Sequence, residues 1–144
     1  MTKLTLMTKL TLMSQLKASE LSGAQLDYYS SIALGYQNMI IIDDVCFQIK
    51  KTIINGRTGE EESIKRVRCS PTNCAETFLS VFKSTQACLE AIGRGWWGAS
   101  CLNESKRFGD PFLLVYGQSP EEALFRLFVT LKLGEFVEGV ETVH

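Results

Sequence analysis

The strongest local signal in the chain is the start of a helix near its C-terminal end. Ser119 is followed by Pro120, Glu121 and Glu122. Serine suits the N-cap, proline suits the first helical position, and a glutamate three residues after the cap completes a capping box. Apolar residues then recur at helical spacing until a glycine follows them: Ala123, Leu124, Leu127, Phe128, Leu131 and Gly134. The pattern predicts a helix that begins at Pro120 and ends before Gly134.

A second helix is predicted near the start of the chain, in the segment that begins with residues 19–27. Ser22 is a suitable N-cap, and apolar residues follow it with approximately helical spacing. Gly35 comes just after the last of them, where a glycine commonly ends a helix.

The segment between these two helices has the pattern of β-hairpins. Residues 39–42 are a short apolar run, and residues 45–54 alternate apolar and polar side chains, which is typical of a half-buried strand. Adjacent Asp43 and Asp44 are expected in the turn between the two strands, where they do not form a paired-carboxylate site.

A longer hairpin is predicted to follow. Asn55-Gly56 is a strong turn dipeptide, and we expect Gly59 to extend it into a polar loop that includes residues 60–62. The returning strand, residues 63–69, places Ile64, Arg66 and Arg68 on one face and Lys65 and Val67 on the other.

Three further elements are predicted before the last helix. Ser70-Pro71 can begin a short helix whose buried side would be Ala75, Phe78, Leu79 and Phe82. Residues 87–92 and 96–102 flank Gly93-Arg94-Gly95 and indicate a hairpin. Residues 112–116 are another apolar stretch.

Together these elements predict an α+β fold, with a small antiparallel sheet built from hairpins and the N-terminal and C-terminal helices packed on one face of it.

The chain has 144 residues, enough for one domain with a single core. Residues 1–12 are one six-residue unit written twice and are followed by Met13. We therefore expect residues 1–13 to be a tail and residues 14–144 to be the domain; the tail could add an edge strand or be disordered. No segment reaches the roughly 18 apolar residues of a membrane helix.

Composition limits the chemistry of the chain. The net charge is -1, which argues against general polyanion binding. The last helix begins with acidic residues, whereas the last helix of double-stranded RNA-binding domains begins with basic residues that contact phosphate. The only histidine is the last residue, His144, which argues against a Ser-His-Asp triad or a Cys-His pair. The five cysteines are an odd number and no export signal is evident, so we expect reduced thiols. No Cys-x-x-Cys pair or nearby histidine completes a metal site, and we expect neither a metal nor a cofactor.

Four stretches of the chain resemble the NinX-like proteins, a family of small tailed-phage proteins of unknown function. They are residues 19–28, 69–75, 95–99 and 117–135, in that order. The second stretch departs from the family pattern, because Asn73-Cys74 and Phe78-Leu79 stand where relatives have Asp-Trp and a glycine pair. The resemblance implies a non-essential phage protein that acts in the cytoplasm of a bacterial host, and it brings no known catalytic residues.

Two groups of residues are candidates for ligand binding. Arg94, Trp96 and Trp97 could stack on a base and bind a phosphate, although a structural hairpin is favoured, in which alternation places one ring in the core and the other on the surface. Lys65, Arg66 and Arg68 belong to a basic cluster on the first hairpin that could bind phosphates. The alternative for this cluster is a solvated face that residues 60–62 partly neutralise.

No combination of nucleophile and base is evident, so we expect a binding protein rather than an enzyme. The leading hypothesis is a phage counter-defence protein that sequesters a phosphate-bearing nucleotide signal of the host, through Arg94, Trp96, Trp97 and the basic cluster. The alternatives are a protein–protein inhibitor of a host defence or nucleic-acid enzyme and, less favoured, a nucleic-acid-binding regulator. Eight phenylalanines also suggest an apolar surface for self-association.

Overall fold

The computed structural model describes residues 15–56, 59–102, 112–139 and 142–143. The duplicated start, residues 1–13, lies outside these ranges. The described part contains three α-helices, two short 3-10 helices and nine strands. The predicted α+β class is therefore confirmed, although the strands form three sheets rather than one.

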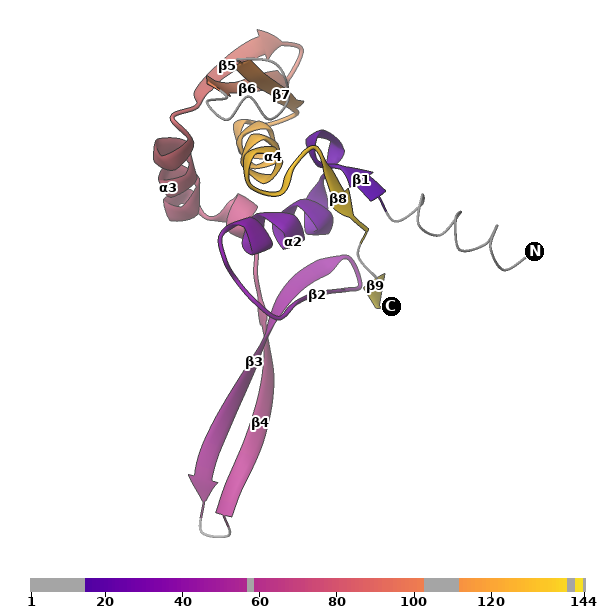
Figure 1. The fold of residues 1–144 in the computed structure, drawn as a ribbon, viewed down its shortest axis with the longest axis vertical. Coiled ribbons are helices and arrows are strands. Elements are labelled where there is room, and N and C mark those ends of the chain that lie inside the picture. The colour runs from indigo at the N-terminus through magenta and orange to yellow at the C-terminus, as the bar shows by residue number, and fades with distance from the viewer. Residues whose placement is uncertain (1–14, 57–58, 103–111, 140–141, 144) are drawn as a thin grey trace, which may run out of the picture.

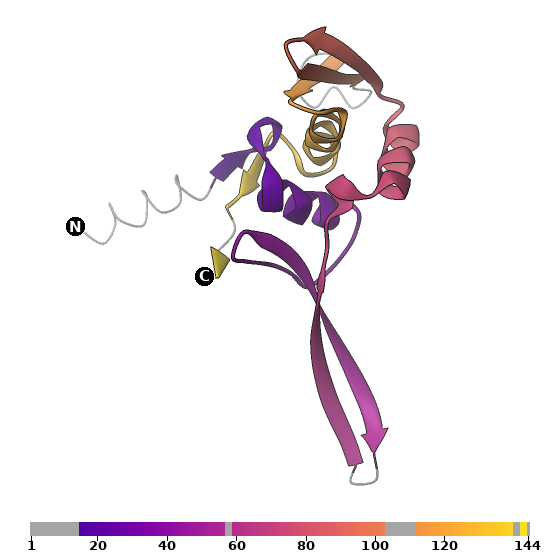
Figure 2. The same ribbon diagram turned by 180° about the vertical axis from the view of Figure 1, so that it is seen from behind.

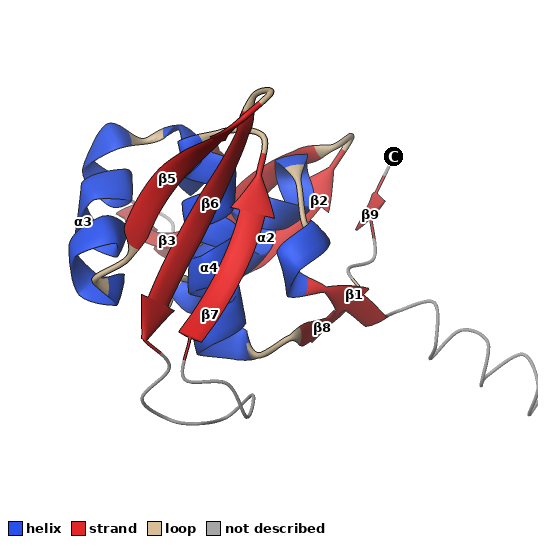
Figure 3. Cartoon of the chain, turned by 90° about the horizontal axis from the view of Figure 1, so that it is seen from above, coloured by secondary structure: helices blue, strands red, loops and turns tan. Residues whose placement is uncertain are grey.

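Helix α4 (Pro120–Leu133) is at the centre of the fold. Residues on every side of it are buried, and Leu124, Phe125, Leu127 and Val129 have no exposed surface. A helix that is apolar all round must have neighbours on more than one side. It packs on one side against a three-stranded sheet and on the other against helix α2 (Gly23–Ala33), as Figures 1 and 3 show.

The sheet over α4 consists of β5 (Cys88–Gly93), β6 (Trp96–Leu102) and β7 (Phe112–Gly117), all antiparallel. This confirms the predicted hairpin and the predicted strand after it. Arg94 has a φ of 55° between two glycines that also have positive φ, and this backbone makes the turn between β5 and β6 tight.

Helix α2 covers a different sheet. It contacts β2 (Met39–Ile42) and the first part of β3 (Val45–Gly56), where Ile41 and Cys46 are buried. Asp43 and Asp44 form the left-handed turn between these strands, as predicted. The expectation that both helices cover one sheet face is wrong, because α2 and α4 lie back to back, each with its own sheet.

Strands β3 and β4 (Gly59–Arg68) form a long ribbon that projects from the body, as Figures 1 and 2 show. Strand β2 pairs only with residues 45–48 of β3, so the ribbon has two strands from Ile49 outward. We call residues 49–68 of this ribbon the arm. Glu60, Glu61 and Glu62 pair with β3 and belong to β4, so the expectation that they lie in a loop is wrong.

The remaining elements connect these layers. Strand β1 (Gln15–Lys17) pairs with β8 (Phe136–Glu138), and β9 (Thr142–Val143) lies parallel to β2. A 3-10 turn (Ala18–Glu20) leads from β1 towards α2.

Helix α3 (Ala75–Thr85) follows a second 3-10 turn, Pro71–Asn73, and packs beside α4. Val81 is its buried residue, whereas Ala75 and Leu79 are exposed. The predicted buried side is therefore only partly right. The helix begins at Ala75 rather than at Pro71. Phe78 and Phe82 do pack against the core beside Val81, and Ala75 and Leu79 lie at the edge of this side of the helix.

Candidate functional site

The basic residues predicted as ligands on the arm divide between its two faces. Residues directly opposite each other in an antiparallel pair point to the same face. Arg68 lies opposite Phe47, and the Arg66 guanidinium lies 5.1 Å from the centre of the Phe47 ring, so these two arginines share a face. Lys65 lies on the other face, opposite Lys50. All three cations are exposed on a projecting ribbon.

The second predicted group is at the other end of the molecule. Arg94 lies in the turn between β5 and β6, next to Trp96, which is 42% exposed. Trp97 is half-buried and packs against the core around α4. The expected alternation of one surface ring and one core ring is confirmed, which favours a structural use of this hairpin.

The structure does not bring the two predicted groups together. The turn between β5 and β6 belongs to the sheet over α4, whereas the arm extends from the opposite side of α2 (Figures 1 and 2). One small ligand cannot contact both groups in a single copy of the chain. None of the six residues lines the cleft described next.

A different set of residues forms a cleft of about 560 Å³ where three helices begin. Gly23 comes from the start of α2, Ala75 from the start of α3, and Ser119 from the start of α4. The cleft has both polar and apolar walls, and the complete lining is Gly23, Leu26, Thr72, Asn73, Cys74, Ala75, Phe78, Ser119, Glu121 and Glu122.

The carboxylate of Asp27 holds one wall of this cleft in place. Asp27 is on α2, and it accepts hydrogen bonds from the Thr72 hydroxyl at 2.6 Å, the Thr72 backbone N–H at 3.2 Å and the Ser70 hydroxyl at 3.2 Å. Ser70 therefore donates to α2 and makes no capping hydrogen bond. These contacts fix the Pro71–Asn73 turn against α2, so the entrance of α3 is positioned relative to α2.

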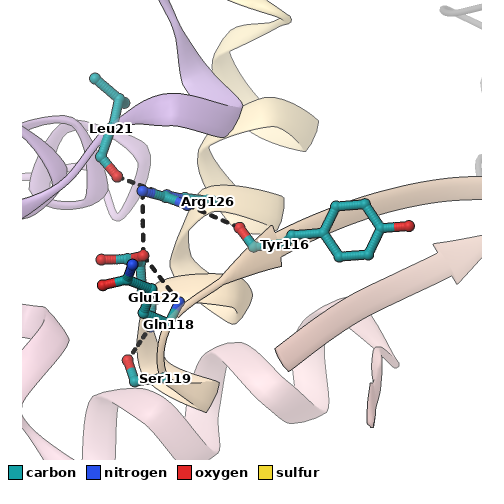
Figure 4. A network of polar contacts seen from close by, with 6 residues as sticks. All are labelled: Leu21, Tyr116, Gln118, Ser119, Glu122 and Arg126. Carbon is teal, nitrogen blue, oxygen red and sulfur yellow. Dashed lines mark hydrogen bonds and ion pairs between the residues drawn. The ribbon is translucent and has the colours of Figure 1, made fainter. Parts of the chain in front are cut away.

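The start of α4 forms another wall, and here the predicted capping is confirmed. The Ser119 hydroxyl accepts a hydrogen bond from the Glu122 backbone N–H at 3.0 Å. The Glu122 carboxylate accepts one from the Gln118 backbone N–H at 3.0 Å, one residue before the cap (Figure 4). Two backbone donors at this helix start are therefore satisfied within the chain.

Arg126 fixes the start of α4 to its neighbours (Figure 4). Its Nε donates to the Leu21 carbonyl at 2.7 Å and its Nη1 to the Tyr116 carbonyl at 2.9 Å. Its Nη2 lies 3.1 Å from the Glu122 carboxylate. The same guanidinium thus joins the entrance of α2, the end of β7 and the first turn of α4, and it balances the charge of Glu122.

The electrostatics of the cleft combine the starts of three helices with the carboxylates of Glu121 and Glu122. Glu76 also lies in the first turn of α3. Ser22 occupies the N-cap position of α2 and its side chain makes no capping hydrogen bond. Cys74 occupies the N-cap position of α3, close to Thr77. Backbone N–H groups and the helix dipole give such an end a partial positive charge. Hydrogen bonds with the hydroxyl and the backbone N–H of Thr77 lower the pKa of the exposed Cys74 thiol. The negative charge of Glu121 opposes an anion in the cleft. Glu121 is exposed, and among the described residues it has no ion pair, whereas Glu122 pairs with Arg126.

Two of the other cysteines, Cys46 and Cys101, are buried. All five cysteines are free. Burial raises the pKa of Cys46 to about 12, and nearby Cys69 contributes to the shift. Burial also raises the pKa of Cys101. Among the described residues, no group of three or more His, Cys, Asp or Glu side chains could hold a metal ion, and no helix is long and apolar enough to cross a membrane.

Sequence reasoning missed this cleft because its residues are far apart in the chain. The available signal was a repeated dipeptide, in which a serine precedes a glycine or a proline at the start of a predicted helix: Ser22-Gly23, Ser70-Pro71 and Ser119-Pro120. Ser22-Gly23 and Ser119-Pro120 mark the starts of α2 and α4, whereas Ser70-Pro71 marks the 3-10 turn before α3. Only the packing of the helices shows that the starts of α2, α3 and α4 meet.

Comparisons with known proteins identify no relative. A scan against protein-family models finds no matching family, and a search of curated proteins finds no significant match.

Proposed function

We propose that the protein is a non-enzymatic binding protein that holds a small phosphate-bearing nucleotide in the cleft at the starts of α2, α3 and α4. The observation that carries this proposal is the convergence of three helix N-termini on one cleft, where the side chain of Ser22 at the start of α2 makes no capping hydrogen bond. Helix N-termini present backbone N–H groups and a positive dipole end to an anion. A phosphate group would bind there through backbone donors, without needing arginine or lysine.

The walls of the cleft suit the rest of a nucleotide. Its volume of about 560 Å³ is within the range of small-molecule sites. Leu26 is buried and Phe78 is half-buried, and together they supply an apolar wall against which a base could pack. Thr72 and Asn73 supply polar groups that could recognise its edge.

The resemblance to NinX-like phage proteins supports the same location. Three of the four stretches that carry it contribute to the cleft: Gly23 and Leu26 lie in the first, Thr72 in the second and Ser119 in the last. In a phage, such a protein would sequester a nucleotide signal of the bacterial host. Sequestration requires tight binding and no chemical step.

The decisive experiment measures nucleotide binding to the wild type and to Ala75→Glu. Ala75 is exposed at the first position of α3 and lines the cleft. A glutamate there is favourable for the helix dipole, so the fold should be retained while the cleft becomes negative. Cyclic mononucleotides and dinucleotides are screened by thermal shift, and hits are titrated by calorimetry. We expect at least one hit, with binding about tenfold or more weaker in Ala75→Glu.

Two further variants separate charge from bulk. Ala75→Gln adds the same volume without the charge and should lose much less affinity. Ser80→Glu adds the same charge at an exposed position of α3 that does not line the cleft, and it should bind like the wild type. A screen without any hit, or equal binding by Ala75→Glu and the wild type, would exclude a nucleotide in this cleft.

Glu121→Gln tests the sign of the ligand charge. Two unit charges about 4 Å apart in water interact by about 1 kcal/mol, so removing the carboxylate should tighten binding of an anionic ligand by about fivefold or less. A cationic ligand would instead bind more weakly. The direction of the change therefore distinguishes the proposed ligand class from its opposite.

A further inference from the structure

The outer edge of β4 has no partner strand in the described part of the chain. The order of its sheet is β4-β3-β2-β9, so β4 is at the end, and all of its side chains except that of Val67 are exposed. A two-stranded ribbon in water is marginally stable, and a long edge strand readily pairs with another chain. The arm also exposes large apolar side chains, since Ile53 is 67% and Ile64 is 63% exposed.

The charges along β4 are ordered. Its first half carries three acids, Glu60–Glu62, and its second half carries three bases, Lys65, Arg66 and Arg68, with Ser63 and Ile64 between them. Reversing the direction of the strand therefore places its acids where its bases were. A second copy of the same strand in the antiparallel direction has the complementary charge pattern.

We propose that two copies of the chain pair through their β4 edges, antiparallel, about a two-fold axis at Ile64. The product is a continuous four-stranded ribbon in the order β3-β4-β4-β3. In this register Glu62 lies opposite Arg66 of the second copy and Glu60 lies opposite Arg68 of the second copy, and the symmetry repeats both pairs. The two Ile64 side chains meet at the axis.

The placement of Ile64 favours this register over its neighbours. When two copies of an edge strand pair antiparallel about a two-fold axis normal to the sheet, the same face of each copy points to the same side. An axis at Ser63 would also pair acids with bases, Glu60 with Arg66 and Glu61 with Lys65, but it would place Glu62 against Ile64 twice. An axis at Lys65 would place two lysines against each other. The axis at Ile64 pairs acids with arginines and isoleucine with isoleucine on the same face as Phe47.

Ion pairs and apolar burial contribute unequally to the stability of the proposed dimer. Each cross-strand ion pair contributes only about 0.2–1 kcal/mol and is screened by salt, so charge mainly fixes direction and register. The new backbone hydrogen bonds and the burial of Ile64 supply the remainder. Lys51 and Glu62 of one copy, which lie 3.7 Å apart, are on the same face and would extend the network of charges.

Charge reversal with mixing tests the proposal. Arg66→Glu/Arg68→Glu makes the paired positions of β4 all acidic, and Glu60→Arg/Glu62→Arg makes them all basic. Mass is measured by sedimentation equilibrium and light scattering, and circular dichroism checks the fold of each variant. We expect a dimer for the wild type, a dissociation constant raised about tenfold or more for each variant alone, and a restored dimer when the two variants are mixed. A monomeric wild type, or dimers that survive in both variants alone, would overturn the proposal.

Disulfide trapping checks the register without changing charge. Ile64→Cys places two thiols together at the axis, where Cα atoms of paired strands are about 4.5–5.5 Å apart, within reach of a disulfide. The exposed Cys74 and Cys88 are first changed to serine. Thr52→Cys, on the inner strand β3, is the control. Rapid cross-linking of Ile64→Cys alone is expected, and equal rates for both would overturn the register.

This inference is independent of the proposed function. The arm and the cleft share no residue, so the charge-reversal variants should keep nucleotide binding and Ala75→Glu should keep the dimer. If the arm instead binds nucleic acid, the wild type remains monomeric and gains mass only with DNA or RNA, which also overturns the dimer.

Discussion

Arg126 offers the sharpest test of how the fold is held together. Its guanidinium donates to the carbonyls of Leu21 and Tyr116 and pairs with Glu122, and its side chain is only 12% exposed. Arg126→Met keeps most of the apolar stem and removes every donor. The two carbonyls and the carboxylate then lose their partner while their surroundings stay packed.

The magnitude follows from these three contacts. A hydrogen bond to a charged group contributes about 1.5 kcal/mol at the low end of its range, and two are lost. The partly exposed ion pair adds about 0.2–1 kcal/mol. We therefore expect Arg126→Met to lower the free energy of unfolding by about 3 to 4 kcal/mol, which is a large part of the stability of a small domain.

Urea denaturation followed by circular dichroism measures this loss. Arg126→Lys keeps the charge but only one compact donor group, so it should lose an intermediate amount. Glu122→Gln removes the ion pair and leaves both carbonyl contacts, so its cost should be below about 1 kcal/mol. If Arg126→Met costs less than about 1 kcal/mol with an unchanged denaturant slope, these contacts do not hold the layers together.

Three further predictions follow from local geometry. A Cβ at Gly117 would lie 2.5 Å from a backbone nitrogen in the first turn of α4. Gly117→Ala should therefore lower the free energy of unfolding by about 1–3 kcal/mol in urea titrations. Gly98→Ala is the control, because its Cβ meets only ordinary contacts, and it should lose less. By the same method, Ser119→Ala should lower the free energy of unfolding by about 1 kcal/mol, because it loses a capping hydrogen bond. Ser22→Ala loses no capping hydrogen bond and should lower it much less. Equal losses would contradict the assigned caps. Burial raises the pKa of Cys46 from 9.0 to about 12, so the native state keeps a proton that the unfolded chain loses. Stability should therefore fall as pH rises from about 9 towards 12, and Cys46→Ala should fall less steeply in melting experiments across that range.

Local elements were predictable because their determinants are adjacent in sequence. The start of α4 needed only Ser119, Pro120 and Glu122, and the turn at Asp43-Asp44 needed only its own two residues and the strands beside it. The alternation of Arg66 and Arg68 against Lys65 also fixed which arm face each occupies, because side chains in a strand alternate.

The loop expected at Glu60–Glu62 shows where local reasoning failed. Three consecutive glutamates after a glycine have low strand propensity, and the sequence pattern favours a loop. Pairing with residues 53–55 extends β4 through them instead, because a hairpin register set at Gly56 and Gly59 continues along both strands. The register therefore decided against the local composition.

By itself, the sequence determined the α+β class, most helix starts and turns, and the separation of basic and acidic residues along β4. Each of these depends on side chains a few positions apart, through capping, turn geometry or alternation. Only the tertiary structure decided that α2 and α4 cover different sheets, that Arg94 and Trp96 lie far from Arg66, and that three helix starts meet in one cleft. Those outcomes depend on contacts such as Asp27 with Thr72 and Arg126 with Leu21, which join residues distant in the chain and leave no periodic signal in it.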